Sequence, residues 1–137
     1  MTYLIDTNIF IILLEKSFHR LSRQQKEIIF NPSSELFLSE ASIYEMAIKA
    51  RLEKPNFSHM NINTIDADRK ANNIKLLKSK IEYYTNIPQV PKAIDSKGKV
   101  HGDPFDLLII SQALVENLQI LSTDSLFPEY QGLKVIS

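Results

Sequence analysis

Short runs of adjacent apolar residues constrain the fold of this chain more than any other feature. Each run is bounded by polar residues and lacks the apolar–polar alternation of a strand with one solvated face. The runs lie at residues 3–5, 36–38, 119–122 and 134–136. Continuous apolar runs of this kind are typical of strands buried in a parallel sheet, which needs helices on both faces. The chain is therefore predicted to adopt an α/β fold.

Helical patterns occupy the segments between these runs. The predicted helices span residues 9–16, 21–30, 39 or 40 to 51, 66–84 (as one helix or two) and 103–117. The stretch 85–100 contains two prolines and shows neither the helical nor the strand pattern of apolar residues. We expect it to form a surface excursion near the functional site. Because strands and helices alternate along the chain, the sheet is predicted to be mainly parallel.

Length and composition indicate one soluble domain. The chain has 137 residues, 44% of them hydrophobic, which predicts a single domain over residues 1–137. Its lack of cysteine excludes disulfides, cysteine-ligated zinc and a thiol nucleophile. Asp6 interrupts the N-terminal apolar run, and no apolar run approaches the length of a membrane span. We therefore expect a cytoplasmic protein without a membrane partner.

The charges of the chain balance, with 16 Lys and Arg against 16 Asp and Glu. This balance excludes a basic nucleic-acid-binding arm, an acidic tail and a disordered chain of high net charge. It leaves nucleic-acid binding open, because a cleft acts through its local field. Lysines at positions 75, 78, 80, 92, 97 and 99, to which Lys49 and Arg51 add near Glu45, either contribute to such a field or form a solvated surface.

Four acidic residues are predicted to meet at one edge of the sheet. Asp6 and Asp124 follow predicted strands, while Glu45 and Asp106 lie near the starts of predicted helices. Two carboxylates about 4 Å apart repel by about 4 kcal/mol at an effective dielectric constant near 20. A hard divalent cation such as Mg²⁺ or Mn²⁺ removes this repulsion and prefers oxygen ligands. His101 is the one histidine near these acids in the sequence and a candidate hydrogen-bond partner for them.

Each acid also has a purely structural interpretation. Asp103 followed by Pro104 is typical of a helix N-terminus, where Asp106 would face the helix dipole. Glu45 can pair with Lys49 one helical turn later. Aspartates are also common where a strand passes into a turn. Taken one at a time, these acids are therefore weak evidence for a catalytic site.

Taken in order, the motifs of the chain resemble those of PIN-domain proteins, and most closely the VapC-type toxins of bacterial toxin–antitoxin pairs. The resemblance rests on Tyr3-Leu-Ile-Asp-Thr-Asn8, Ser39-Glu-Ala-Ser-Ile-Tyr-Glu45, His101-Gly-Asp-Pro-Phe-Asp106 and Ile120-Leu-Ser-Thr-Asp124. It extends over nearly the whole chain, and the His-x-Asp-Pro-Phe-Asp block is its most specific part. It implies a compact α/β/α sandwich and a Mg²⁺- or Mn²⁺-dependent endoribonuclease.

The resemblance also implies a set of site residues and partners. The catalytic and metal-binding quartet would be Asp6, Glu45, Asp106 and Asp124, with Asp103 as an additional metal ligand. Supporting polar positions would be Thr7, Asn8, Ser122 and Thr123. The implied partners are an RNA substrate, a cognate antitoxin and a second copy of the chain in a homodimer. The chain departs from many relatives at Leu107, where they have arginine.

Two alternative functions remain open at this point. A PIN-like module that binds RNA or protein without cleavage is suggested by the missing arginine at Leu107. A phosphatase or phosphotransfer receiver with an aspartate nucleophile is disfavoured, because Thr7, and not a second acid, follows Asp6. That class would also need a lysine after a late strand, and the chain has none at the expected place.

Overall fold

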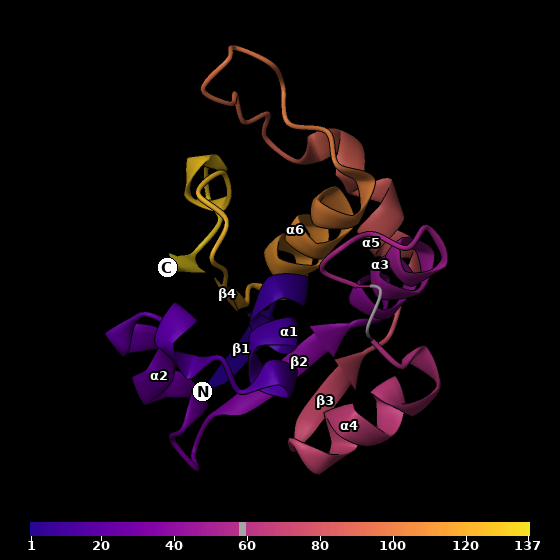
Figure 1. Cartoon of the computed structure of the whole chain (residues 1–137). Helices are drawn as coiled ribbons and strands as arrows, with labels where there is room; N and C mark the ends of the chain where they lie inside the picture. The colour runs from indigo at the N-terminus through magenta and orange to yellow at the C-terminus, as the bar shows by residue number, and fades with distance from the viewer. Residues whose placement is uncertain (58–59) are drawn as a thin grey trace.

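The computed structural model describes residues 1–57 and 60–137, which contain one sheet with helices on both faces (Figure 1). The strands are β1 (Thr2–Ile5), β2 (Glu35–Ser39), β3 (Ile74–Leu77), β4 (Gln119–Leu121) and β5 (Val135–Ile136). Their order across the sheet is β3-β2-β1-β4-β5, and every pairing is parallel. The predicted α/β class with a parallel sheet is confirmed, and β1 occupies the centre.

Helices form the two outer layers. The α-helices are α1 (Thr7–Glu15), α2 (Arg23–Ile29), α3 (Glu40–Arg51), α4 (Ile65–Ala71), α5 (Ile81–Thr85) and α6 (Pro104–Glu116). Short 3-10 helices are η1 (Phe18–Arg20), η2 (Ile62–Thr64), η3 (Ile87–Gln89) and η4 (Phe127–Glu129). Among the described residues, no helix combines the length and the apolar character needed to cross a membrane.

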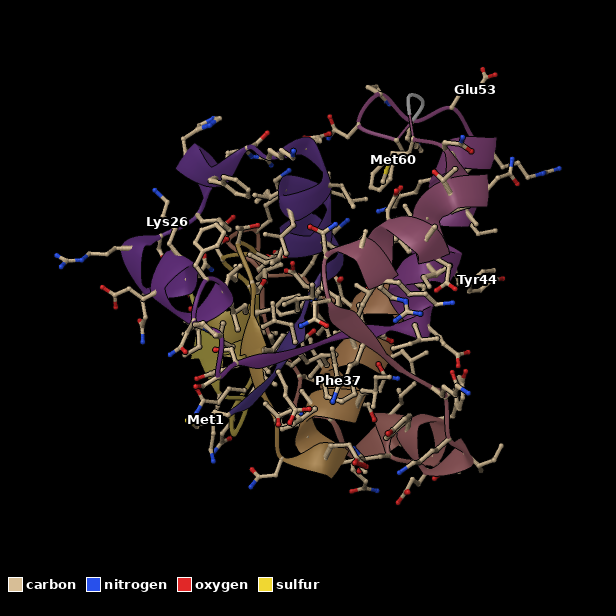
Figure 2. The ribbon with its side chains drawn as sticks, turned by 90° about the horizontal axis from the view of Figure 1, so that it is seen from below. Met1, Lys26, Phe37, Tyr44, Glu53 and Met60 are labelled. Atoms are coloured by element: carbon tan, nitrogen blue, oxygen red, sulfur yellow. The ribbon has the colours of Figure 1, made fainter. Side chains whose placement is uncertain are left out.

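Side-chain alternation along β1 divides the hydrophobic core in two. Tyr3 and Ile5 point to one face and pack with α1 and with the buried side of α3, whereas Leu4 points to the other face and packs with α6. In the register of the sheet, Ile5 lies beside Leu38 on one side and Leu121 on the other. The carboxyl ends of three central strands therefore lie together at one edge of the sheet. In Figure 2, Tyr44 and Glu53 point away from this packed body.

The prediction of helix throughout residues 66–84 was wrong. This segment contains α4, then β3 at Ile74–Leu77, then the short α5. Asn73 adopts a left-handed backbone conformation (φ 57°) directly after α4, which ends the helix and turns the chain into the strand. β3 is an edge strand with only its first residue buried, so its apolar run is too short and too exposed to stand out against the helical spacing around it.

The stretch 85–100 forms a hairpin whose tip leaves the body of the molecule, visible between α5 and α6 in Figure 1, while Val90 and Ala93 at its base are buried in the core. Ile94 and Val100 form an isolated antiparallel bridge. At the tip, Asp95 Oδ1 accepts hydrogen bonds from the backbone N–H groups of Lys97 (2.8 Å) and Lys99 (2.9 Å). The predicted surface excursion is confirmed for the exposed tip, which has defined turn structure, but not for the buried Val90 and Ala93.

Candidate active site

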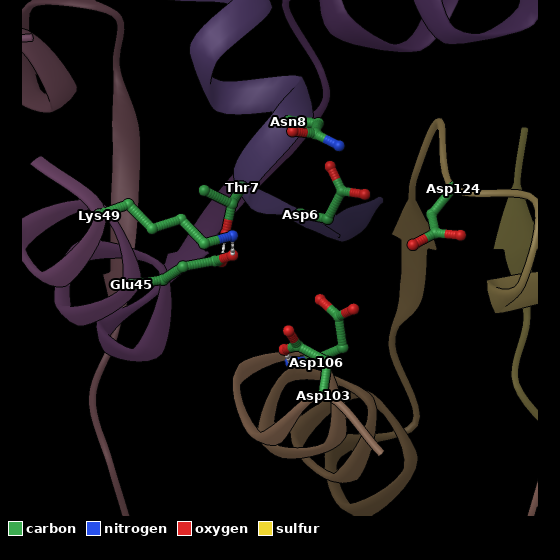
Figure 3. A pocket seen from close by; sticks show the side chains of 8 residues that line it. All are labelled: Asp6, Thr7, Asn8, Glu45, Lys49, Asp103, Asp106 and Asp124. Carbon is green, nitrogen blue, oxygen red and sulfur yellow. Dashed lines mark hydrogen bonds and ion pairs between the residues drawn. The ribbon is translucent and has the colours of Figure 1, made fainter. Parts of the chain in front are cut away.

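Acidic side chains from four segments line one pocket at the carboxyl edge of the sheet (Figure 3). The pocket is lined by Asp6, Thr7, Asn8, Glu45, Lys49, Asp103, Asp106 and Asp124. Asp6 directly follows β1, Asp124 lies in the turn after β4, Glu45 belongs to α3, and Asp103 and Asp106 belong to the start of α6. The structure thus brings all five candidate acids together, although they are spread over more than a hundred positions of the chain.

Helix capping holds several of these acids in place. Asp6 is the N-cap of α1 and its Oδ1 accepts from the N–H of Ile9 at 2.8 Å. Asp103 is the N-cap of α6 and its Oδ1 accepts from the N–H of Asp106 at 3.0 Å. The structural interpretation of these two aspartates is therefore confirmed. Capping orients these two carboxyl groups at the pocket wall. Each aspartate can therefore cap a helix and also take part in the chemistry of the pocket.

Glu45 is almost fully buried, with 6% of its surface exposed, and both of its oxygens are engaged. Oε1 accepts from the Thr7 hydroxyl at 2.7 Å, and Oε2 lies 2.6 Å from Lys49 Nζ. The Thr7 hydroxyl also lies 2.9 Å from that of Ser42. The predicted pairing of Glu45 with Lys49 is confirmed. Lys49 also lines the pocket, because its spacing from Glu45 places both residues on the same helix face.

Burial and mutual repulsion raise the proton affinity of two of the acids. Burial raises the pKa of Asp6 to about 6, with further contributions from the charges of Asp124 and Glu45, while hydrogen bonds from Ser122 and Ile9 lower it. Burial raises the pKa of Asp106 to about 8, and the surrounding carboxylates add to the shift. Five acids against one lining lysine leave an excess of negative charge in this pocket.

The donor set of the pocket fits a divalent cation. Carboxylate oxygens are the preferred ligands of Mg²⁺ and Mn²⁺, and a cation would offset the repulsion that raises the two aspartate pKa values. Within residues 1–57 and 60–137, no three His, Asp or Glu side chains are already grouped closely enough to hold an ion. Binding therefore requires some of these carboxylates to move toward the ion.

The four supporting polar residues are not all at the pocket. Thr7 and Asn8 line it. The Ser122 hydroxyl hydrogen-bonds to Asp6 and accepts from the N–H of Asp124 at 3.0 Å, so it supports two of the acids. Thr123 is exposed and lines a neighbouring cavity that it shares with Asp124 and Arg20. The structure therefore brings three of the four to the acids and leaves Thr123 outside.

Residues around α6 complete the surroundings of Asp106. His101 Nε2 lies 3.3 Å from Asp106 Oδ2, and its Nδ1 lies 2.6 Å from the hydroxyl of Tyr130. His101 therefore contacts the site as the sequence suggested, whereas Tyr130 was missed because it lies 24 positions beyond Asp106 in no recognisable motif. Leu107 packs against the hydrophobic cluster beneath α6 and does not line the pocket.

The candidate basic cluster is dispersed in the structure. Lys75 is a residue of β3 and pairs with Glu35 at 2.7 Å, so it does not lie on the helix face that the sequence suggested. Lys80 pairs with Glu116 at 3.5 Å. Lys92, Lys97 and Lys99 are exposed on the hairpin. None of these lysines lines the acidic pocket, where the lining cation is Lys49.

Comparisons with known proteins give a family match and structural neighbours. The family model described as PIN domain matches residues 3–133. A search of curated proteins finds no match. A chain in VapBC2 from Rickettsia felis, bound to a DNA fragment from their promoter, is 18% identical with a TM-score of 0.64, and the alignment covers 99% of this chain and 98% of that chain.

Two further complexes show the same likeness. A chain in DNA-bound VapBC from Salmonella typhimurium is 17% identical, with a TM-score of 0.67 and coverage of 99% and 97% of the two chains. A chain in VapBC-1 from nontypeable Haemophilus influenzae is 20% identical, with a TM-score of 0.64 and coverage of 100% and 98%. At these identities the likeness establishes a shared fold over the full length of the matched chains.

Proposed function

The chain belongs to the PIN-domain family, and on that premise we propose that it is a metal-dependent endoribonuclease acting as the toxin of a toxin–antitoxin pair. The observation that carries the proposal is the meeting of five carboxyl groups in one pocket at the carboxyl edge of the sheet. Two of these groups have pKa values well above that of an ordinary aspartate, so a bound cation would stabilise their ionised forms. We further propose that the protein acts on RNA in the cytoplasm.

In this proposal Asp6, Glu45, Asp106 and Asp124 hold Mg²⁺ or Mn²⁺, and Asp103 adds a further ligand. When bound there, the ion supplies the Lewis acidity that activates a water and offsets charge on the phosphodiester. The N-cap interaction of Asp6 fixes one wall of the pocket.

The remaining polar residues of the pocket position these ligands. Thr7 donates to Glu45 and holds its carboxylate toward the pocket. Ser122 supports both Asp6 and Asp124, while Asn8 is exposed at the rim and available to an RNA strand. Thr123 lies in the neighbouring cavity, where a longer substrate would pass.

The structural neighbours support an antitoxin as the proposed partner. The matched chains come from VapBC assemblies, which are named as toxin–antitoxin systems in the Mycobacterium tuberculosis example. We accordingly propose a small antitoxin that covers the acidic pocket. As a separate proposal, which these neighbours do not bear on, the chain forms a homodimer.

A non-cleaving PIN-like module that binds RNA or protein is the alternative. Leu107 favours it, because the chain lacks the cation that many relatives place after Asp106, and Leu107 packs inward. The acids themselves favour cleavage, because a module that only bound RNA would gain nothing from a pocket of negative charge that repels phosphates. Lys49 supplies a cation at the same pocket and compensates in part for the missing arginine.

A cleavage assay separates these two functions. Antitoxin-free protein is expected to degrade total RNA in Mg²⁺ or Mn²⁺, and EDTA should stop the reaction. Asp6→Asn and Asp106→Asn should each abolish cleavage, while Glu27→Gln, which neutralises a highly exposed acid on α2, should not change it. RNA binding without cleavage by the wild type, or cleavage that survives both aspartate substitutions, would rule out the proposed function.

A further inference from the structure

We propose that His101 and Tyr130 are a positioning pair that fixes the orientation of the Asp106 carboxylate. The proposal rests on the proposed function, because it takes Asp106 as a metal ligand. Neither residue lines the acidic pocket, so they act through Asp106 and do not touch substrate. The proposal also assigns a function to the hairpin over residues 85–100, because this hairpin ends directly before His101 and positions it beside Asp106.

The three side chains form a continuous chain of polar contacts. Tyr130 OH lies 2.6 Å from His101 Nδ1, and His101 Nε2 lies 3.3 Å from Asp106 Oδ2. They come from three separate segments: the end of η4, the base of the hairpin and the first turn of α6. Such an arrangement links the C-terminal part of the fold to the pocket wall through two side chains.

Burial makes the contact between Tyr130 and His101 obligatory. Tyr130 is only 1% exposed, so its hydroxyl cannot turn to water and needs a partner within the protein. Burial, together with the nearby carboxylates, raises the pKa of Tyr130 to about 12, so the hydroxyl keeps its proton. The described contacts of this hydroxyl give it one partner, the His101 ring nitrogen.

The direction of the hydrogen bonds follows from the charge of Asp106. Once a divalent ion is bound as proposed above, Asp106 is ionised and only accepts hydrogen bonds, so the His101 Nε2 that faces it must carry a proton. In neutral imidazole the other nitrogen is then an acceptor, and it takes the proton of the Tyr130 hydroxyl. Tyr130 thereby selects the tautomer of His101 that donates to Asp106. In metal sites, a residue that does not touch the ion often orients a metal ligand by hydrogen bonding to it. His101 has this role toward Asp106, and Tyr130 adds a second hydrogen bond behind His101.

The backbone around His101 is built to hold the ring there. The N–H of His101 donates to the carbonyl of Ala93 at 2.8 Å, and Ala93 is buried in the core beneath α6. The bridge between Ile94 and Val100 closes the hairpin just before this point. The His101 ring also meets the Tyr130 ring edge-on, with centroids 5.8 Å apart and an interplanar angle of 72°. Both ring position and ring rotation are therefore restricted.

Mn²⁺ titrations followed by electron paramagnetic resonance test the pair without relying on RNA cleavage. Loss of an outer hydrogen-bonding partner typically lowers metal affinity about 10- to 100-fold. We expect His101→Leu to lower Mn²⁺ affinity by about that factor, and Tyr130→Phe to lower it by about 10-fold or less. His101→Gln should recover part of the loss, because its amide N–H reaches the position of Nε2. His19→Leu and Tyr3→Phe, at residues outside the pocket, are the matched controls and should bind as the wild type.

The tautomer of His101 distinguishes a positioning role of Tyr130 from a role in stability alone. If Tyr130 only stabilised the fold, replacing it would not change which ring nitrogen of His101 carries the proton. Nitrogen-15 NMR of the Mg²⁺-bound protein should show the proton on Nε2 in the wild type and a mixture of tautomers in Tyr130→Phe. Adding Tyr130→Phe to His101→Gln should have no further effect on Mn²⁺ affinity.

Three results would overturn the positioning role. They are a proton on Nδ1 in the wild type, a tautomer unaffected by Tyr130→Phe, or unchanged Mn²⁺ affinity in His101→Leu while the wild type binds normally. Absence of Mn²⁺ binding by the wild type would instead overturn the proposed function, and the positioning role with it.

Discussion

At the scale of single residues, the acids of the pocket serve two purposes that differ in their dependence on charge. Asp6 caps α1 with one oxygen while its charge is disfavoured by burial and by Asp124 and Glu45. Capping needs an acceptor oxygen, which asparagine also provides, whereas cation binding needs the negative charge. The two purposes can therefore be separated by a single substitution.

Asp6→Asn is expected to leave the thermal midpoint in EDTA unchanged or higher, because the cap is retained and repulsion is removed. The same substitution should reduce RNA cleavage at least about 100-fold, since one ligand of the ion is weakened. Differential scanning calorimetry and a cleavage assay on the same preparation measure both effects. A large loss of stability would show that the Asp6 charge is structural.

Lys49 is predicted to stabilise the protein most when no divalent ion is bound. Lys49→Met leaves the buried Glu45 carboxylate without its ion-pair partner, which should lower the free energy of unfolding in EDTA by about 1 to 3 kcal/mol. Mg²⁺ should restore part of this loss by supplying another cation. Urea denaturation with and without Mg²⁺ measures the difference, and Lys70→Met, at a mostly exposed lysine on α4, is the control. Equal losses in both conditions would contradict the prediction.

At the scale of elements, the three central strands, the edge strand β5 and the capped helices could be predicted from the sequence, but the edge strand β3 could not. β1 and β2 each contain three consecutive apolar residues, and α6 begins with a strong Asp-Pro signal. β3 is short and mostly not buried, so its residue pattern indicates part of a helix and not a strand. The meeting of Asp6, Glu45, Asp106 and Asp124 followed from the parallel topology, because the carboxyl ends of parallel strands share an edge. Asp103 was added to this set by the family resemblance. Tyr130 could not be found this way, since its contact depends on how the C-terminal turn packs.

The hairpin over residues 85–100 is predicted to depend on Asp95. Asp95→Ala removes the acceptor for two backbone N–H groups at the tip, so amide hydrogen exchange at residues 94–100 should accelerate. Because the tip is exposed, the global free energy of unfolding should change by less than about 0.5 kcal/mol. Hydrogen-exchange mass spectrometry and urea denaturation measure these two quantities. Unchanged exchange at the tip would show that other contacts hold the hairpin.

At the scale of the whole molecule, the zero net charge conceals an uneven distribution. Five acids are gathered in one pocket, so basic residues are in excess over the rest of the protein. Lysines on the hairpin and elsewhere on the surface can attract an RNA backbone, while the pocket repels it until a cation is bound. Metal loading and RNA binding are therefore expected to be coupled.

The pocket should also make the stability of the whole molecule depend on pH. The folded-state pKa values of Asp6 (about 6) and Asp106 (about 8) lie above the ordinary value of 3.8. Between about pH 4 and pH 8 the folded state therefore binds more protons than the unfolded state, and stability falls as the pH rises. In EDTA we expect a loss on the order of a few kcal/mol across this window.

Divalent ions and Asp106→Asn should both flatten this pH dependence, the ion by favouring the ionised carboxylates and the substitution by removing one of them. Urea denaturation at several pH values, in EDTA and in Mg²⁺, measures the slope. Stability that rises with pH in EDTA would contradict the account of the pocket.

The central claim is that the acidic pocket drives RNA cleavage by holding a divalent ion. The most direct test follows the rate of RNA cleavage and the Mn²⁺ occupancy of the protein in the same titration. We predict that the rate rises in proportion to occupancy in the wild type, and that Asp106→Asn lowers both. Cleavage at zero occupancy, or full occupancy without cleavage, would contradict the claim.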